Sequence, residues 1–248
     1  MKRIRSVALV CAGPISRGRV ARLPGLVDHL GWIKAPSFRL ASRAVNVLRA
    51  GVPVNDYEEL DPADLIVVSV PRELEDCTIA DLASSRIDWR HRAAVLLDTE
   101  KESSALKPLL ERGALLATLL LIGAAEDWTL VIEGRREAVK LMRRALTPRV
   151  SQAMQVITTA GKARLLAGID EATRGFFPAI ASVTDHFKSA GLSKSQSEVL
   201  AQGLMISSMR SYFRAGRRVL STAIEKTASV RSVTVAVLCS TLTALAEI

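Results

Sequence analysis

The sequence predicts an α/β protein in which a mostly parallel sheet domain is followed by an all-helical C-terminal domain. Three observations support this fold class. Short apolar segments rich in Val, Ile and Leu alternate with segments of helical periodicity through the first 150 residues. After Pro148 strand-like segments become rare, and from about residue 162 apolar residues recur at helical spacing. A chain of 248 residues is also long enough to form two domains.

Seven segments of the first domain, taken as residues 1–150, have the composition of β-strands. Three of them are continuous apolar runs, which is typical of strands buried on both faces of a parallel sheet. Helices are expected over residues 20–30, shortened or kinked at Pro24-Gly25 and ended by Gly31, and over 41–50, ended by Gly51. The expected strands are residues 5–10, 32–35, 52–54, 65–70, 93–97, 115–122 and 128–132.

The second domain is expected over residues 160–248, with the boundary between residues 148 and 160. Its apolar content is high for so short a segment, and helices of this kind often complete their core against a second copy. We therefore expect a homodimer through the C-terminal helices. Phe176, Phe177 and Phe187 recur at near-helical spacing, which favours the core or the dimer interface over a substrate site.

The turn after the first strand carries a reduced form of the dinucleotide-binding motif of Rossmann-type domains. At the three glycine positions of G-x-G-x-x-G the sequence has Cys11, Gly13 and Ser16. A glycine lets the backbone approach a pyrophosphate closely, and the following helix N-terminus supplies partial positive charge. One glycine is weak evidence alone, but its place directly after an apolar strand favours a Rossmann-type domain. The expected cofactor-binding residues of this turn are Gly13, Pro14, Ile15 and Ser16.

Basic and hydroxyl side chains follow the second strand, where NAD-binding proteins usually place an acidic residue. The stretch contains Ser37, Arg39 and Arg43 and no carboxylate. These groups suit a 2′-phosphate, so the sequence favours NADP over NAD, with an ordinary basic helix start as the alternative. Arg17 and Arg19 lie beside the glycine turn and can pair with phosphate, although for Arg19 an exposed position on the helix is favoured.

Further residues of the expected site follow the fourth and fifth strands. Ser69, Val70 and Pro71 end the fourth strand at the edge where a nicotinamide would lie. The dipeptide Asp98-Thr99 has the same position after the fifth strand.

The formal net charge of +9 is the one unusual feature of the overall composition. A solvated basic surface explains it, and so does a polyanionic cofactor. Nucleic acid is not expected as a partner, because the basic residues are scattered and stacking aromatic residues are few. Cys11, Cys77 and Cys239 are widely spaced, which favours reduced thiols in the cytoplasm. The start of the chain has no signal-peptide pattern, and no apolar run is long enough to span a membrane, so we expect no membrane segment. The histidines lack metal-ligand spacing, so we expect no metal site.

Several stretches of both domains resemble pyrroline-5-carboxylate reductases. In the first domain these are C-A-G-P-I-S at residues 11–16, S-x-R-x-x-S-R at 37–43, D-Y-E-E-L at 56–60 and A-D-L-I-V-V-S-V-P at 63–71. In the second, G-F-F-P-A at 175–179 is similar to the G-S-G-P-A of that family, and A-G-L at 190–192 matches the start of its next helix. A-S-V-R-S-V-T at 228–234 stands where the family carries its substrate loop V-T-S-P-G-G-T-T.

The resemblance implies an NADP-dependent reductase that transfers hydride to a cyclic imine, such as a pyrroline-carboxylate, or to a related small substrate. It implies Ser229 and Thr234 as catalytic hydroxyls, and Arg231 and Ser232 as substrate-binding residues. Capping and packing of a terminal helix is the alternative role for Ser229 and Thr234. The P-G-G of the substrate loop is replaced at Val230, Arg231 and Ser232, and the family's M-P-N segment by apolar residues 115–121. A homodimeric binding or scaffold protein that kept the fold and lost the reaction is therefore the alternative function.

Overall fold

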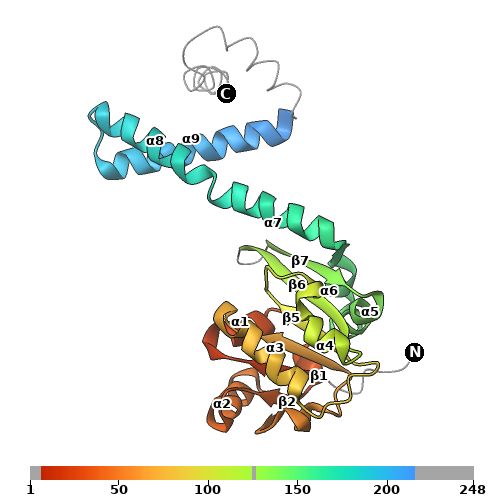
Figure 1. Ribbon diagram of the computed structural model, residues 1–248. Helices are drawn as coiled ribbons and strands as arrows, with labels where there is room; N and C mark the ends of the chain where they lie inside the picture. Colours follow the sequence, from red (N-terminus) through yellow and green to blue (C-terminus); the bar gives the residue numbers. More distant parts are fainter. Residues whose placement is uncertain (1–6, 125–126, 216–248) are drawn as a thin grey trace. The chain divides into compact units, whose positions relative to one another are not determined.

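The computed structural model describes residues 7–124 and 127–215 of the chain (Figure 1). It divides into two compact units between Ala167 and Gly168. The division lies further along the chain than the sequence indicates, because residues after 150 still add a strand to the sheet of the first unit.

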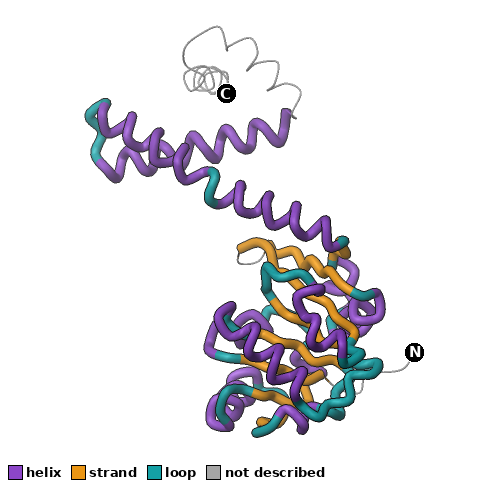
Figure 2. Tube along the Cα trace, in the orientation of Figure 1, coloured by secondary structure: helices purple, strands orange, loops and turns teal. Residues whose placement is uncertain are grey.

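The first unit is built on one eight-stranded sheet of order β3-β2-β1-β4-β5-β6-β7-β8 (Figure 2). Neighbouring strands are parallel except for the antiparallel pair β6 and β7. All seven expected strands are present, and the short β8 is an addition. The strands are β1 (Val7–Cys11), β2 (Leu30–Lys34), β3 (Val52–Val54), β4 (Leu65–Ser69), β5 (Ala93–Leu97), β6 (Leu115–Ala124), β7 (Asp127–Gly134) and β8 (Gln155–Ile157).

Helices of two kinds connect and follow the strands. The α-helices are α1 (Gly13–Ala21), α2 (Phe38–Leu48), α3 (Glu75–Ser84), α4 (Lys107–Glu111), α5 (Arg136–Ala145), α6 (Pro148–Ala153), α7 (Thr159–Thr173), α8 (Phe176–Ser189) and α9 (Lys194–Ala215). Short 3-10 helices are η1 (Val27–His29), η2 (Tyr57–Leu60), η3 (Arg72–Leu74) and η4 (Ser103–Leu106).

Each face of the sheet is covered by its own hydrophobic core. Alternate residues of a strand point to opposite faces, so Leu9 of β1 packs with α1, α2 and α5. Its neighbour Val10 packs on the other face with η2, α3 and α4. The connections therefore change face between β1 and β4. In open α/β sheets, ligands bind at the carboxyl ends of the strands beside such a crossover.

The first helix begins and ends earlier than its apolar spacing predicts. It covers Gly13–Ala21, and Leu30 and Gly31, expected at its end, form the start of β2. Pro24 and Gly25 make the turn instead. Gly25 has φ +92°, and a Cβ built on it would lie 2.5 Å from the backbone nitrogen of Thr147. This close approach requires glycine, so the turn ends the helical region.

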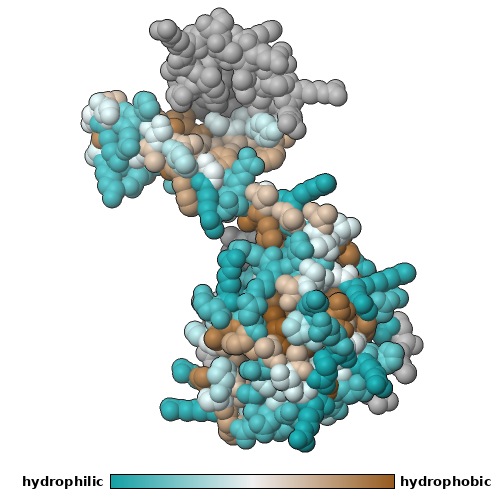
Figure 3. Space-filling model, viewed as in Figure 1, coloured by the Kyte–Doolittle hydropathy of each residue, from teal (hydrophilic) through white to brown (hydrophobic). Residues whose placement is uncertain are grey.

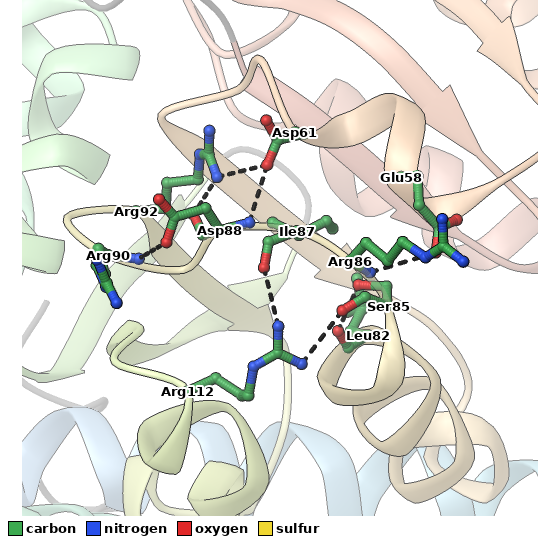
Figure 4. A network of polar contacts seen from close by, with 10 residues as sticks. All are labelled: Glu58, Asp61, Leu82, Ser85, Arg86, Ile87, Asp88, Arg90, Arg92 and Arg112. Atoms are coloured by element: carbon green, nitrogen blue, oxygen red, sulfur yellow. Dashed lines mark hydrogen bonds and ion pairs between the residues drawn. The ribbon is translucent and has the colours of Figure 1, made fainter.

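The loop before β5 is held by polar contacts at the amino ends of the strands (Figure 4). Arg112 donates hydrogen bonds of 3.2 Å to the carbonyls of Ser85 and Ile87, and a further one to that of Ala83. Asp61 accepts from the backbone nitrogen of Asp88 at 2.9 Å and pairs with Arg92 at 2.6 Å. This network lies at the edge of the sheet opposite the carboxyl ends.

The described part of the second unit contains α8 and α9, which pack against each other. Thr184, Ser197 and Ala201 are buried, whereas the aromatic rings of Phe176 and Phe177 are exposed and Phe187 is half-buried. Among the described residues, no helix combines the length and the apolar character that crossing a bilayer requires. The other exposed large apolar side chains of this unit are Ile180, Val199, Leu200, Met209, Tyr212 and Phe213.

Candidate functional site

Two pockets open at the carboxyl ends of the parallel strands, beside the crossover. The first, here called the β1–β2 pocket, has a volume of about 310 Å³ and includes Cys11, Lys34 and Val70 in its lining. The second, the β4–β5 pocket, has a volume of about 340 Å³ and is lined by residues that follow β4 and β5, together with Arg19 of α1. Val70 lines both pockets, so they adjoin at the end of β4. Figure 3 shows that apolar side chains reach the surface of the first unit among many hydrophilic ones.

The turn between β1 and α1 has the backbone geometry of an anion site. Gly13 has φ +77°, and a Cβ built on it would meet no atom within 4 Å, so the space above the turn is open. Helix α1 starts without a side-chain cap and has no acidic residue in its first turn. Pro14 and the backbone of Ile15 and Ser16 form that first turn. Uncapped N–H groups and the helix dipole favour an anion at this position.

Lys34 carries the positive charge of the β1–β2 pocket. It is the last residue of β2, and its Nζ lies 5.0 Å from the centroid of the Tyr57 ring and donates to the carbonyl of Ala35 at 2.7 Å. Asp81 of α3 lines the same pocket. Burial, with the nearby charges of Asp81 and Cys77, raises the pKa of Tyr57 to about 12. The phenol therefore stays a neutral hydrogen-bond donor.

The residues that the sequence indicates for the 2′-phosphate lie outside this pocket. Ser37 is the N-cap of α2, and its Oγ accepts a hydrogen bond from the backbone nitrogen of Leu40 at 3.3 Å. Arg39 and Arg43 are exposed on α2. The lining contains Lys34 instead, which sequence reasoning missed although it ends the second strand.

Two ion pairs lie in the wall of the β4–β5 pocket. Arg19 Nε is 2.6 Å from Asp98 Oδ2, so the side chain expected at the surface of α1 instead contacts the end of β5. Arg72 of η3 pairs with Glu100 at 2.7 Å. Asp98 has φ +58°, a left-handed conformation that costs energy for a non-glycine residue. Pro71, Glu73, Glu75 and Thr99 complete the lining with Val70.

Glu75, the first residue of α3, is the buried acid of this pocket. Its side chain accepts a hydrogen bond from Thr99 Oγ1 at 3.0 Å, and Lys101 Nζ lies 3.7 Å from the same carboxylate oxygen. Burial raises the pKa of Glu75, and the contacts with Thr99 and Lys101 oppose this rise. No local pattern distinguishes this residue, since Glu75 lies in an acidic stretch that is typical of an ordinary helix start.

Behind the pocket, a second buried carboxylate is saturated with hydrogen bonds. Glu133 of β7 accepts from the backbone nitrogen of Ser103 at 2.8 Å, from its hydroxyl at 2.7 Å, from Thr159 at 2.9 Å and from Thr118 at 3.1 Å. Burial raises its pKa, but these hydrogen bonds outweigh burial and hold the pKa below the ordinary value.

Lys162 of α7 is the cation of this buried cluster. Only 1% of it is exposed, and its Nζ donates to Thr118 Oγ1 at 2.7 Å and to the carbonyl of Lys101. Thr118 thus accepts from Lys162 and donates to Glu133. Desolvation lowers the pKa of Lys162, with the charge of Glu133 opposing. The cluster ties α7, β6 and β7 to the loop that follows β5.

The other expected site residues divide into two groups. The structure places Ser69 at 0% exposure at the end of β4, with its carbonyl accepting from the backbone nitrogen of Ala12 at 3.3 Å. Ser229, Arg231, Ser232 and Thr234 lie outside the described residues, as does Cys239. Among the residues that the structure does describe, no group of three His, Cys, Asp or Glu side chains could hold a metal ion.

No protein-family model matches the sequence, and no curated protein matches it. Solved structures match its fold over nearly the whole chain. A pyrroline-5-carboxylate reductase from Coxiella burnetii has 10% sequence identity and a TM-score of 0.55, covering 99% of this chain and 98% of its own. An imine reductase from Bacillus cereus has 16% identity and a TM-score of 0.61, covering 88% and 78%. A reductive aminase from Aspergillus terreus, in complex with NADPH and ethyl-5-oxohexanoate, has 13% identity and a TM-score of 0.59, covering 90% and 78%.

These similarities confirm the expected fold, a Rossmann-type sheet domain followed by helices, as that of pyrroline-5-carboxylate reductases and imine reductases. At 10% to 16% identity they establish the fold alone.

Proposed function

We propose that the protein is an NADP-dependent reductase that transfers hydride to the C=N bond of a small, protonated imine. The observation that carries the proposal is the pair of adjoining pockets at the crossover of the sheet. The lining of one includes Ala12, directly before the open turn at Gly13, and the lining of the other has four carboxyl groups against two guanidiniums. The fold is that of proteins described as imine reductase, reductive aminase and pyrroline-5-carboxylate reductase, which supports the same reaction class.

The residues of the first pocket fit a dinucleotide. The open space at Gly13 accommodates a close approach of a pyrophosphate, and the uncapped start of α1 favours its charge. Lys34 at the end of β2 would hold a 2′-phosphate, and no carboxylate ends that strand to favour the free ribose diol of NAD. When bound, NADPH supplies the hydride, so the protein needs to position the imine and provide a proton.

The charge of the second pocket supports a cationic substrate. Its lining contains two guanidiniums, of Arg19 and Arg72, against the four carboxyl groups of Glu73, Glu75, Asp98 and Glu100. This excess of acidic groups stabilises the imine in its protonated form, although the chain as a whole is basic. A substrate carboxylate would need a cation from elsewhere, and Arg231 with Ser232 remains the proposed source. Ser229 and Thr234 remain proposed hydroxyls of the substrate loop.

The exposed apolar side chains of α8 and α9 support a homodimer. They include Phe177 at 63% and Phe213 at 80% exposure, and a second copy that covers them would remove this apolar surface from water. A cytoplasmic location accords with Cys11 and Cys77, neither of which forms a disulfide within the described part of the chain.

Titration with NADPH and with NADH, followed by fluorescence, tests the proposal. We expect saturable binding of NADPH, weaker binding of NADH, and oxidation of bound NADPH on addition of 1-pyrroline. Gly13→Val should abolish binding by filling the turn, whereas Gly18→Ala is the matched control, since a Cβ there also meets no atom within 4 Å and Gly18 lies inside α1. The absence of any saturable response would instead favour a scaffold protein that kept the fold and lost the reaction. Two sequence features support this alternative, namely Cys11 at the first glycine position and the altered segment 230–232.

A further inference from the structure

The carboxyl group of Glu75 differs from the three other acids of the β4–β5 pocket. Only 3% of Glu75 is exposed, although it lines the pocket. Asp98 and Glu100 are engaged by the guanidiniums of Arg19 and Arg72, and Glu73 is exposed. Glu75 is therefore the acid that combines burial with a place in the pocket wall.

The partners of Glu75 fix its position without a direct ion pair of normal length. Thr99 Oγ1 donates to Glu75 Oε2 at 3.0 Å and itself accepts from the backbone nitrogen of Lys101 at 3.0 Å. The ammonium of Lys101 lies 3.7 Å from Oε2 but forms its close contact with exposed Asp76. The Thr99 hydroxyl thus orients the carboxyl group of Glu75, while the ammonium of Lys101 contacts the exposed carboxylate of Asp76.

The charges around Glu75 come from four parts of the fold, of which α7 supplies the buried ammonium of Lys162. Arg72 lies on η3, Asp76 is the next residue of α3, and Lys101 follows β5. Burial raises the pKa of Glu75, Lys101 and Arg72 lower it, and Asp76 adds to the rise. Burial predominates, so Glu75 retains a proton at higher pH than an exposed glutamate does.

We propose that Glu75 is the proton donor of the β4–β5 pocket, acting on the nitrogen of the imine. This inference rests on the proposed function. The imine enters the pocket neutral, the O–H bond of Glu75 breaks with its electron pair remaining on the carboxylate, and the lone pair of the imine nitrogen forms the new N–H bond, which gives the protonated imine. The hydride that NADPH supplies forms the C–H bond at carbon, while the π pair of C=N moves to nitrogen. Water returns a proton to Glu75 after the amine leaves.

The Glu75 carboxylate that remains after proton transfer can also bind the product. A carboxylate beside the newly formed amine binds it as an ion pair once that amine takes a further proton from water. A protonated cyclic amine is therefore a probe of Glu75 that needs no dinucleotide.

Kinetics of 1-pyrroline reduction by the full chain, at saturating NADPH, test the proton transfer. General acid catalysis contributes about 10²–10⁴-fold, so Glu75→Gln should lower kcat by at least about 10²-fold, remove the decline of kcat at high pH and leave NADPH binding unchanged. Asp76→Asn is the matched control, because it removes a neighbouring carboxylate that contacts the same lysine outside the pocket. It should keep kcat within about twofold. A Glu75→Gln protein that reduces 1-pyrroline at the wild-type rate overturns the inference.

Two measurements that need no catalytic turnover test the role of Glu75 independently of the proposed function. In ¹³C-glutamate NMR of the unliganded protein, one carboxyl should titrate above the others and vanish in Glu75→Gln. It should persist in Asp76→Asn, at a lower pH than in the wild type because Asp76 adds to the rise of the Glu75 pKa. Calorimetry should show pyrrolidinium binding weakened at least tenfold by Glu75→Gln alone.

If the Glu75→Gln variant does not fold, Thr99→Val replaces it, since losing the hydroxyl should raise the pKa that NMR measures for Glu75 further. Equal pyrrolidinium affinity of Glu75→Gln and wild type, or a Thr99→Val titration that does not move, overturns the inference even if NADPH binds. Failure of NADPH binding with these signals present refutes only the proposed function.

Discussion

Arg19 and Asp98 join the first helix of the sheet domain to the end of its fifth strand, with Nε and Oδ2 2.6 Å apart. The pair lies in the wall of the β4–β5 pocket, with Arg19 in the last turn of the helix that begins at Gly13. Arg19 is partly exposed, and ion pairs of this kind contribute only about 0–1 kcal/mol to stability. Its effect should therefore be seen in ligand binding more than in folding.

Replacing Arg19 with Met should weaken NADPH binding about tenfold, which corresponds to about 1.4 kcal/mol. The physical reason is that the loss of the guanidinium leaves the Asp98 carboxylate uncompensated, and its negative charge then repels the anionic dinucleotide in the adjoining pocket. Fluorescence titration measures the dissociation constant. Exposed Arg22, just beyond α1, provides the control, and equal effects of Arg19→Met and Arg22→Met would indicate general charge rather than position.

Replacing Lys34 with Met should reduce the preference for NADPH over NADH. Lys34 ends β2 and lines the β1–β2 pocket, so we expect about a tenfold loss for NADPH, the free-energy equivalent of one charge-assisted hydrogen bond, and little change for NADH. Parallel titrations with both dinucleotides measure this ratio. Arg39→Met is the companion variant. A ratio that changes in Arg39→Met and not in Lys34→Met would restore the sequence prediction for α2.

Gly134→Ala should destabilise the sheet domain by about 3 kcal/mol or more, as backbone clashes and incompatible φ angles do. Gly134 has φ +141°, and a Cβ there would lie 2.4 Å from Ala117 Cα and from the carbonyl oxygen of Leu116. Urea unfolding followed by circular dichroism measures the loss. Gly18→Ala on α1 should instead be neutral or slightly stabilising, and a similar loss in both variants would contradict this account.

Glu133 should make the stability of the protein depend on pH in the acidic range. Its folded-state pKa lies below the ordinary value of 4.5, so its contribution is fully present above about pH 4.5 and is lost as the pH falls through the lower folded pKa. The free energy of unfolding should therefore fall more steeply between pH 5 and the folded pKa in the wild type than in Glu133→Gln. Unfolding curves that remain parallel across this range would show that the carboxylate is not linked to folding.

Arg112→Met should destabilise the protein by about 1–3 kcal/mol, because three backbone carbonyls lose a charged donor. The network of Figure 4 lies at the amino ends of the strands, so NADPH affinity should be unchanged. Thermal unfolding and dinucleotide titration of the same sample measure both quantities. A loss of affinity that matches the loss of stability would indicate a role of this edge in ligand binding.

The strands were predictable from the sequence because burial on both faces leaves continuous runs of Val, Ile, Leu and Ala, as in β4 and β5. The short β8 was not predictable, because Gln155 and Val156 are exposed and a strand of three residues is too short to show an alternation of apolar and polar residues. The first helix was misplaced because its apolar spacing continues through the turn at Pro24 and Gly25 into β2. The packing of Gly25 against Thr147, which fixes that turn, joins distant parts of the sequence.

The candidate site was predictable where it depends on one βα turn, as at Gly13, and at the ends of β4 and β5. The contacts that define its chemistry are long-range. Arg19 reaches Asp98, Glu75 meets Thr99, and Lys162 reaches Lys101, so no local pattern distinguishes them from surface charges. Lys34 lines the pocket and Arg39 does not, a distinction that the sequence does not show because it does not indicate which side of the strand end faces the pocket.

The four hydrogen bonds to Glu133 have a consequence for how the protein accommodates its ligands. A carboxylate whose oxygens are both saturated cannot shift without breaking several bonds at once, and Ser103 and Lys101 are bound to the same cluster. The wall of the pocket that follows β5 is thus preorganised. Adaptation to substrates of different shape must then come from other walls, and changing substrate range by engineering should begin with residues 70–73 rather than 98–103.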